Sequence, residues 1–185
     1  MICCPAGKIQ RMVSMSTSGT TAKAKRIAFT QSDLKNTVEF FHHGMNTLCN
    51  AGDTVMIFMP GNAPDGLCDL LSRGLKCFNA EPKVYGIIHD YDDAANICEK
   101  NSAVFVGIPV QMRRLALLHP ELKPKMVLLS ADYCAPAVIN TIARKWCCEV
   151  YVHYGLTESG LGCAVETPAR IGMIPRSDIL LETLP

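Results

Sequence analysis

Apolar and polar positions follow a strand-then-helix rhythm along the chain. Short apolar runs at 11–16 and 26–30 predict two strands separated by a polar loop. Apolar residues then recur at spacings of three and four from Leu34 to Leu48, which predicts a helix capped by Thr30 or Ser32. The turn-forming stretch 50–53 ends this helix.

The same cycle continues through most of the remaining sequence. Strands are predicted over 55–59, 84–88, 103–107, 125–130 and 149–153, with helices from the loop 60–66 to about 77 and over 92–100, 109–119 and 136–146. Beyond 155, the stretches 163–166, 172–174 and 179–182 are short strands or loop segments. Strands that alternate with helices predict an α/β fold with a mostly parallel sheet and helices on both faces.

Composition supports one compact domain. The chain has 185 residues, a net charge of +1, 49% hydrophobic residues and 19% charged residues. A chain of this length buries roughly 70% of its unfolded surface, and the high apolar content excludes disorder. The near-neutral charge argues against a partner that is a nucleic acid or a membrane surface and favours a small molecule.

The predicted location is the cytoplasm. No apolar run approaches the roughly 18 residues of a membrane-spanning helix, and the start lacks the features of a signal peptide. The ten cysteines include no C-x-x-C pair, so we interpret them as small buried hydrophobes in a reducing compartment. A zinc-supported structural fragment stays an alternative, with Cys134, Cys147, Cys148 and Cys163 as its candidate ligands.

The segment 16–26 is a candidate phosphate-binding loop. It places five hydroxyl side chains around Gly19, followed by Lys23, Lys25 and Arg26, between two predicted strands. Small residues let backbone N–H groups converge on an anion, hydroxyls add donors and lysine adds a point charge. It is not a Walker A motif, because no helix begins after the lysine. A solvated loop is the alternative.

A second candidate segment, 153–158, ends a predicted strand. Ligands of open α/β sheets collect beyond the carboxyl ends of the strands, so this segment is placed to meet the phosphate loop. Tyr154 offers a ring for a planar base, Gly155 permits close backbone approach, and Thr157 and Glu158 offer a hydroxyl and a magnesium ligand.

Together the two segments resemble motifs of the adenylate-forming superfamily, which includes acyl- and aryl-CoA synthetases, firefly luciferase and peptide-synthetase adenylation domains. The first is similar to [ST]-S-G-T-T-G-x-P-K and the second to Y-G-x-T-E. Within the superfamily, 160–166, 172–174 and 178–182 resemble phenylacetate-CoA ligase and coenzyme F390 synthetase-like proteins. The resemblance implies part of the large N-terminal domain of such an enzyme, without the family's N-terminal portion and C-terminal lid domain.

The resemblance also implies residue roles. The ATP phosphates are handled by Thr17, Ser18, Gly19, Thr20, Thr21 and Lys25. Adenine meets Ser130, Ala131 and Asp132, while Tyr154, Gly155 and Leu156 border adenine and the acid. Thr157 contacts the α-phosphate and Glu158 holds Mg²⁺, so the catalytic set is Lys25, Thr157 and Glu158. The acid pocket is lined by Pro60, Gly61, His153 and Gly155.

The implied reaction is ATP-dependent activation of an aryl or acyl carboxylic acid, with release of pyrophosphate and transfer to coenzyme A. The sequence departs from the family pattern at Ala22 and Ala24, where relatives carry glycine and proline. A methyl group at a glycine position costs about 1 kcal/mol where the backbone needs positive φ. A non-catalytic nucleotide-binding module therefore stays an alternative, and another chain or domain is a possible source of the lid.

Overall fold

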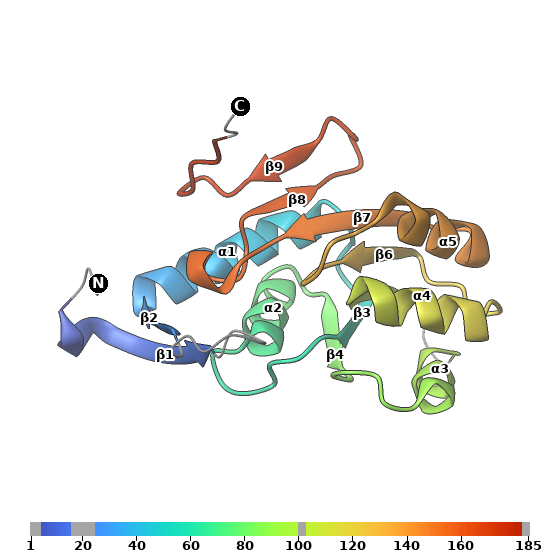
Figure 1. Cartoon of the computed structure of the whole chain (residues 1–185), viewed down its shortest axis with the longest axis horizontal. Helices are drawn as coiled ribbons and strands as arrows, with labels where there is room; N and C mark the ends of the chain where they lie inside the picture. The colour runs from blue at the N-terminus through green and yellow to red at the C-terminus, as the bar shows by residue number, and fades with distance from the viewer. Residues whose placement is uncertain (1–4, 16–24, 100–102, 183–185) are drawn as a thin grey trace.

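A computed structural model describes residues 5–15, 25–99 and 103–182 of the chain. The elements alternate as the sequence predicts (Figure 1). The strands are β1 (Ile9–Met15), β2 (Lys25–Thr30), β3 (Thr54–Phe58), β4 (Glu81–Val84), β5 (Ala103–Gly107), β6 (Met126–Leu129), β7 (Glu149–Tyr154), β8 (Ala164–Glu166) and β9 (Met173–Pro175). The helices are α1 (Gln31–Asn46), α2 (Leu67–Lys76), α3 (Tyr91–Glu99), α4 (Pro109–Leu118) and α5 (Pro136–Trp146), with short 3₁₀ turns η1 (Ala6–Lys8) and η2 (Thr157–Ser159).

The predicted α/β architecture is confirmed. The main sheet has the order β4-β3-β5-β6-β7-β8-β9, in which the strands from β4 to β7 are parallel and β8 and β9 are antiparallel additions. The strands β1 and β2 form a separate antiparallel pair. Each parallel connection passes through a helix, as right-handed crossovers require.

Helices cover both faces of the parallel strands (Figure 1). Side chains of α1 and α2 pack on one face, in a core that includes Phe41, Leu75 and Ile57. Side chains of α3, α4 and α5 pack on the other, in a core that includes Phe105 and Trp146. Alternate residues of β3, β5, β6 and β7 supply the two cores, which explains why the sequences of these strands are mostly apolar.

The first long helix begins where the sequence predicts. Thr30 caps α1, since its side chain accepts a hydrogen bond from the backbone N–H of Asp33, and the Asp33 carboxylate accepts from the backbone N–H of Thr30. This reciprocal pair satisfies two N–H groups that a helix start leaves free. Apolar side chains at Leu34, Phe41 and Met45 then face the core.

The prediction of a strand over 84–88 is wrong in its position. The structure has β4 at Glu81–Val84, paired with β3 alone at the edge of the sheet. An edge strand tolerates Pro82 and charged side chains, so its apolar pattern is weak. The backbone N–H groups of Tyr85 and Gly86 both bond to the Ile57 carbonyl, and the positive φ of Gly86 (93°) ends the pairing.

The last part of the chain is irregular. The stretches predicted as short strands or loops become β8, β9 and, over 179–182, loop. No helix in the described ranges combines the length and the apolar character that crossing a membrane requires.

Candidate functional site

A cleft lies beyond the carboxyl ends of the parallel strands. Its volume is about 310 Å³, within the usual range for small-molecule sites. Seven of the predicted site residues line it, from three separate segments of the chain: Pro60, Gly61, Ser130, Ala131, Gly155, Leu156 and Thr157. We call this hollow the central cleft. The folding of the sheet therefore brings together residues that are up to about a hundred positions apart.

A second hollow, the outer cleft, adjoins the central cleft. It has a volume of about 580 Å³ and shares Ala131, Gly155 and Leu156 with the central cleft. The predicted adenine residues Asp132 and Tyr154 line it. Tyr154 is half-exposed, so its ring face is available to a planar group. The arrangement can hold a base in one hollow and a charged group in the next.

The junction of the two clefts has an unusual backbone. Ala131 adopts the left-handed conformation, with φ of 71°, although it carries a Cβ atom. This conformation costs about 1–2 kcal/mol for such a residue. Strained residues of this kind cluster at ligand sites, where the surrounding structure holds them.

A tight turn after β7 forms one wall of the central cleft. A methyl group on Gly155 would lie 2.1 Å from the Leu161 carbonyl oxygen and 2.7 Å from Cε1 of His153, so only glycine fits there. The turn is fixed on α1, because the Thr37 hydroxyl donates a buried 2.7 Å hydrogen bond to the Gly160 carbonyl. The motif requires glycine at 155 because the Leu161 backbone approaches it closely, and not because its φ is positive.

The predicted acid-pocket loop 60–66 is also fixed by local geometry. Gly61 has φ of 98°, and a methyl group on Gly66 would lie 2.2 Å from the Gly61 carbonyl oxygen. Arg73 of α2 bonds to Asp65 at 2.5 Å and so ties the loop to the helix behind it. The loop therefore presents its first residues to the cleft in one conformation.

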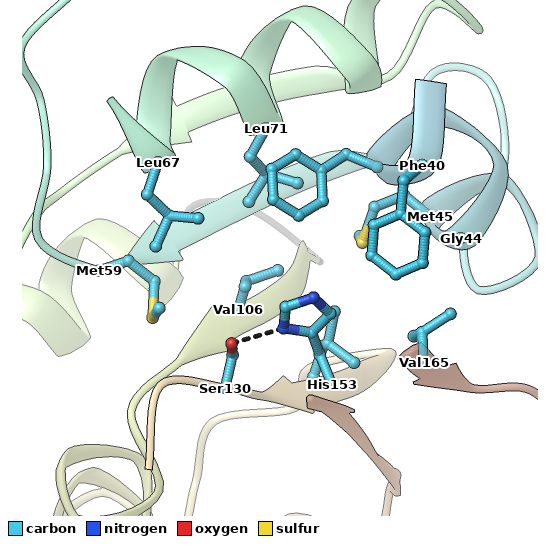
Figure 2. A pocket seen from close by; sticks show the side chains of 12 residues that line it. Phe40, Gly44, Met45, Met59, Leu67, Leu71, Val106, Ser130, His153 and Val165 are labelled. Atoms are coloured by element: carbon cyan, nitrogen blue, oxygen red, sulfur yellow. Dashed lines mark hydrogen bonds between the residues drawn. The ribbon is translucent and has the colours of Figure 1, made fainter. Parts of the chain in front are cut away.

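His153 lines a small apolar cavity on the α1 side of the sheet (Figure 2). Its Nδ1 lies 2.7 Å from the Ser130 hydroxyl, and its Nε2 is buried without a hydrogen-bond partner. Burial lowers the pKa of His153 to about 4, so the imidazole is neutral at pH 7. Tyr154, the next residue along β7, points to the other face and lines the outer cleft.

Among the predicted charged residues, Asp132 lines the outer cleft, whereas Glu158 lines neither cleft. Glu158 is exposed in η2, and its carboxylate forms no ion pair with a residue in the described ranges. Lys25 begins β2, where its backbone pairs with Met15 of β1, four positions along that strand from Arg11, which lines the central cleft. The predicted phosphate-binding residues Thr17, Ser18, Gly19, Thr20 and Thr21 fall outside the residues that the structure describes.

Some lining residues were not predicted from the sequence. Arg11, Phe29, Leu67 and Leu161 line the central cleft, and Phe40 lines the apolar cavity. Leu67 directly follows the loop 60–66, so the prediction that this loop lines the acid pocket could have been extended to Leu67. Phe40 lies on the helix that the apolar spacing predicts, but nothing local connects that helix to the end of β7.

The zinc alternative finds no site in the described ranges. They contain no group of three or more His, Cys, Asp or Glu side chains that could hold a metal ion. Cys163 is buried, whereas Cys147 is exposed. Burial raises the pKa of the Cys134 and Cys148 thiols to about 11, which disfavours the thiolate that zinc needs.

Solved structures share this fold. An open conformation of 2-hydroxyisobutyryl-CoA ligase, in complex with 2-HIB-AMP and CoA, has a TM-score of 0.76 at 17% identity, over 96% of this chain and 43% of that one. O-succinylbenzoate coenzyme A synthetase from Bacillus subtilis, in complex with AMP, has a TM-score of 0.63 at 15% identity, over 84% of this chain and 32% of that one. The chain therefore spans less than half the length of these structures. Its fold is that of the N-terminal domain of adenylate-forming enzymes.

A family model also matches most of the sequence. The match covers residues 10–179 and is to the AMP-binding enzyme family. The chain belongs to this family. No curated protein matches it in a sequence comparison.

Proposed function

We propose that this chain is the central part of an enzyme that activates a carboxylic acid with ATP. The supporting observation is the central cleft, where the predicted adenine, acid and α-phosphate residues converge from three segments of the chain. Family membership supports the same reaction class. The product is an acyl-adenylate, and the second step passes the acyl group to coenzyme A.

The chemistry needs placement and charge neutralisation. One carboxylate oxygen forms a bond to the α-phosphorus of ATP, and the bond from that phosphorus to the bridging oxygen of the β-phosphate breaks, releasing pyrophosphate. The coenzyme A thiol then loses its proton and forms a thioester at the acyl carbon, and AMP leaves. Orientation and fixed donors supply most of the acceleration in such reactions.

We assign the described residues as follows. In the central cleft, Thr157 donates its hydroxyl to an α-phosphate oxygen, and Gly155 lets the acyl phosphate approach the backbone. In the outer cleft, adenine lies against Tyr154, beside Ala131 and Asp132. Lys25 adds a positive charge for the leaving pyrophosphate. The wall shared by the two clefts suits an adenylate that has its base on one side and its acyl group on the other.

Glu158 is the proposed magnesium ligand. Mg²⁺ binds proteins through one or two carboxylates and keeps waters and substrate phosphates as its other ligands. An exposed carboxylate without an ion pair in the described ranges fits this role. The ion, when bound, neutralises charge on the transferring phosphates.

The finer specificity is also a proposal. The resemblance of the terminal segment favours a phenylacetate-CoA-ligase-like enzyme, cytoplasmic, with an aryl or acyl acid as substrate. The chain covers 43% of a ligase that was solved with CoA, so the proposal assigns the lid, with its further catalytic groups, to another domain or chain.

Isotope exchange between pyrophosphate and ATP tests the proposed function. We expect exchange that depends on added acid and Mg²⁺, and a higher Mg²⁺ requirement for that exchange in Glu158→Gln. The matched control is Glu182→Gln, which alters another exposed glutamate far along the terminal loop. ATP binding without exchange, in the chain and with any lid partner, would favour the non-catalytic nucleotide-binding module. Absence of ATP binding would refute both functions.

A further inference from the structure

The turn that carries Thr157 and Glu158 rests against a buried arginine. Gly160 closes this turn, since its N–H donates to the Thr157 carbonyl at 3.1 Å and its φ is 77°. A methyl group on Gly160 would lie 3.0 Å from the Thr37 hydroxyl and 3.3 Å from Nη1 of Arg176. The end of the turn is therefore in close contact with α1 and with the Arg176 guanidinium.

Arg176 reaches the turn from the loop after β9, and contacts along its length fix its orientation. Its backbone N–H donates to the Cys163 carbonyl at 2.7 Å. Its Nε and Nη2 donate to the two carboxylate oxygens of Asp178 at 2.6 and 3.2 Å. One of these oxygens also accepts a 3.1 Å hydrogen bond from the Asn36 amide of α1. A bidentate pair sets the plane of a guanidinium as well as its position, so Asp178 fixes the arginine on the helix.

The ion pair of Arg176 and Asp178 lies away from the two clefts. Neither residue lines the central cleft or the outer cleft, whereas Thr157 lines the central cleft. The Arg176 side chain is 11% exposed and that of Asp178 is 38% exposed. The influence of this pair on a ligand in either cleft therefore passes through Gly160 and the turn.

Stability alone does not explain a buried arginine at this position. Its Nη1 is buried and has no hydrogen-bond partner in the ranges that the structure describes. A buried donor without a partner lowers stability, and replacing a buried ion pair by apolar side chains of similar volume often leaves stability unchanged or raises it. A requirement for geometry explains the residue better, because the planar head of arginine meets a carboxylate in one orientation.

We propose that Arg176 is a positioning residue for acid activation, which holds the turn 157–159 so that the Thr157 hydroxyl meets the α-phosphate and the Glu158 carboxylate meets Mg²⁺. This inference rests on the proposed function. Arg176 itself touches neither the nucleotide nor the ion. A displacement of about 1 Å in a reacting group costs about a hundredfold in rate, so the loss of this contact is measurable.

The test removes the ion pair from the full chain in two ways. The double variant Arg176→Met with Asp178→Leu fills the space with apolar side chains, and we expect its Tm to stay within about 3 °C of wild type. Arg176→Lys keeps the charge and loses the planar fork. The matched control, Lys35→Met with Glu39→Leu, removes an exposed ion pair from α1.

Two measurements separate positioning from stability. Amide hydrogen exchange reports on the turn directly: in the double variant we expect the N–H groups of Gly160 and Leu161 to exchange at least about tenfold faster, while amides of β5 keep their wild-type rates. In the exchange of pyrophosphate with ATP, we expect the maximal rate to fall at least about tenfold and the KM for ATP to stay within about threefold, because a misplaced turn weakens contacts to the transition state. Arg176→Lys should retain part of the rate, and the control should match wild type.

The outcomes distinguish this inference from the proposed function. Unchanged exchange of the Gly160 and Leu161 amides, or faster exchange with an unaltered maximal rate, overturns the inference and leaves the proposed function standing. If the wild-type chain, with any lid partner present, exchanges no pyrophosphate, the proposed function is overturned and the inference with it. If the double variant does not fold, Arg176→Lys and Asp178→Asn decide the matter, and a wild-type maximal rate in both overturns the inference.

Discussion

Replacement of Gly155 by alanine tests the account of the turn after β7. The new methyl group would lie 2.1 Å from the Leu161 carbonyl oxygen, which is about 1 Å inside ordinary contact distance. The turn has little freedom to move away. The Leu161 N–H donates to the Leu156 carbonyl at 2.8 Å, and the next carbonyl back, that of Gly160, is held by Thr37.

The magnitude follows from these contacts. Overpacking typically costs 1–3 kcal/mol, and displacing the turn also weakens the buried Thr37 hydrogen bond, which contributes about 1 kcal/mol. We therefore expect Gly155→Ala to lower the free energy of unfolding by about 3 kcal/mol. For a chain of this size, that corresponds to a fall in Tm of about 6–12 °C.

The assay is urea denaturation followed by circular dichroism, together with ATP titration. Gly7→Ala is the matched control, because a methyl group on Gly7 meets nothing within 4 Å. Its stability should stay within about 0.5 kcal/mol of wild type. If Gly155→Ala is as stable as Gly7→Ala and binds ATP normally, the close approach does not shape the cleft and the reasoning is wrong.

Three further predictions concern other parts of the molecule. Thr30→Ala removes the cap of α1 and should cost about 1 kcal/mol in urea denaturation, whereas Ser32→Ala should cost little, because Ser32 makes no capping bond. Glu158→Gln should leave Tm unchanged, since the carboxylate is exposed, yet raise the Mg²⁺ concentration needed for pyrophosphate exchange; an unaltered Mg²⁺ dependence would contradict its assignment. Burial lowers the pKa of His153 to about 4 in the folded state, from a value near 6.5 in the unfolded chain. The unfolded chain therefore binds more protons between these two pH values, so the free energy of unfolding is full above about pH 6.5 and falls by about 3 kcal/mol toward pH 4. Denaturation series at several pH values should show that His153→Phe flattens this part of the profile.

The repeating elements of the fold were predictable because their signals are local. The cap at Thr30 and the spacing of Leu34, Phe41 and Met45 identify α1 within a stretch of 16 residues. The buried parallel strands are short, continuous apolar runs with turn residues on both sides. The position of β4 was predicted wrongly because an edge strand with one neighbour carries few apolar side chains.

The candidate site was predictable in part. The residues that line the clefts lie at strand ends, where parallel sheets collect ligands, and their motifs are contiguous in sequence. The pairing of Ser130 with His153, 23 residues apart, and the bond from Thr37 to Gly160, 123 residues apart, are products of the tertiary fold. No local pattern encodes them. The roles assigned to the site residues, from 17–21 and Lys25 to Thr157 and Glu158, stay predictions from sequence.

The alternation of side chains at the end of β7 separates two tasks in the proposed enzyme. His153 lines the apolar cavity and also borders the outer cleft, whereas Tyr154 lines the outer cleft, so only the first of these neighbouring positions reaches the cavity. Mutations on the side of α1 that faces the apolar cavity can therefore change which acid the proposed enzyme accepts without altering the surface proposed to meet the nucleotide, whereas a mutation at 153 alters both. Descendants of one ancestral sequence could diversify their acids along this route while keeping ATP as the common reagent, and a library randomised at cavity positions alone is the natural starting point for engineering new substrates.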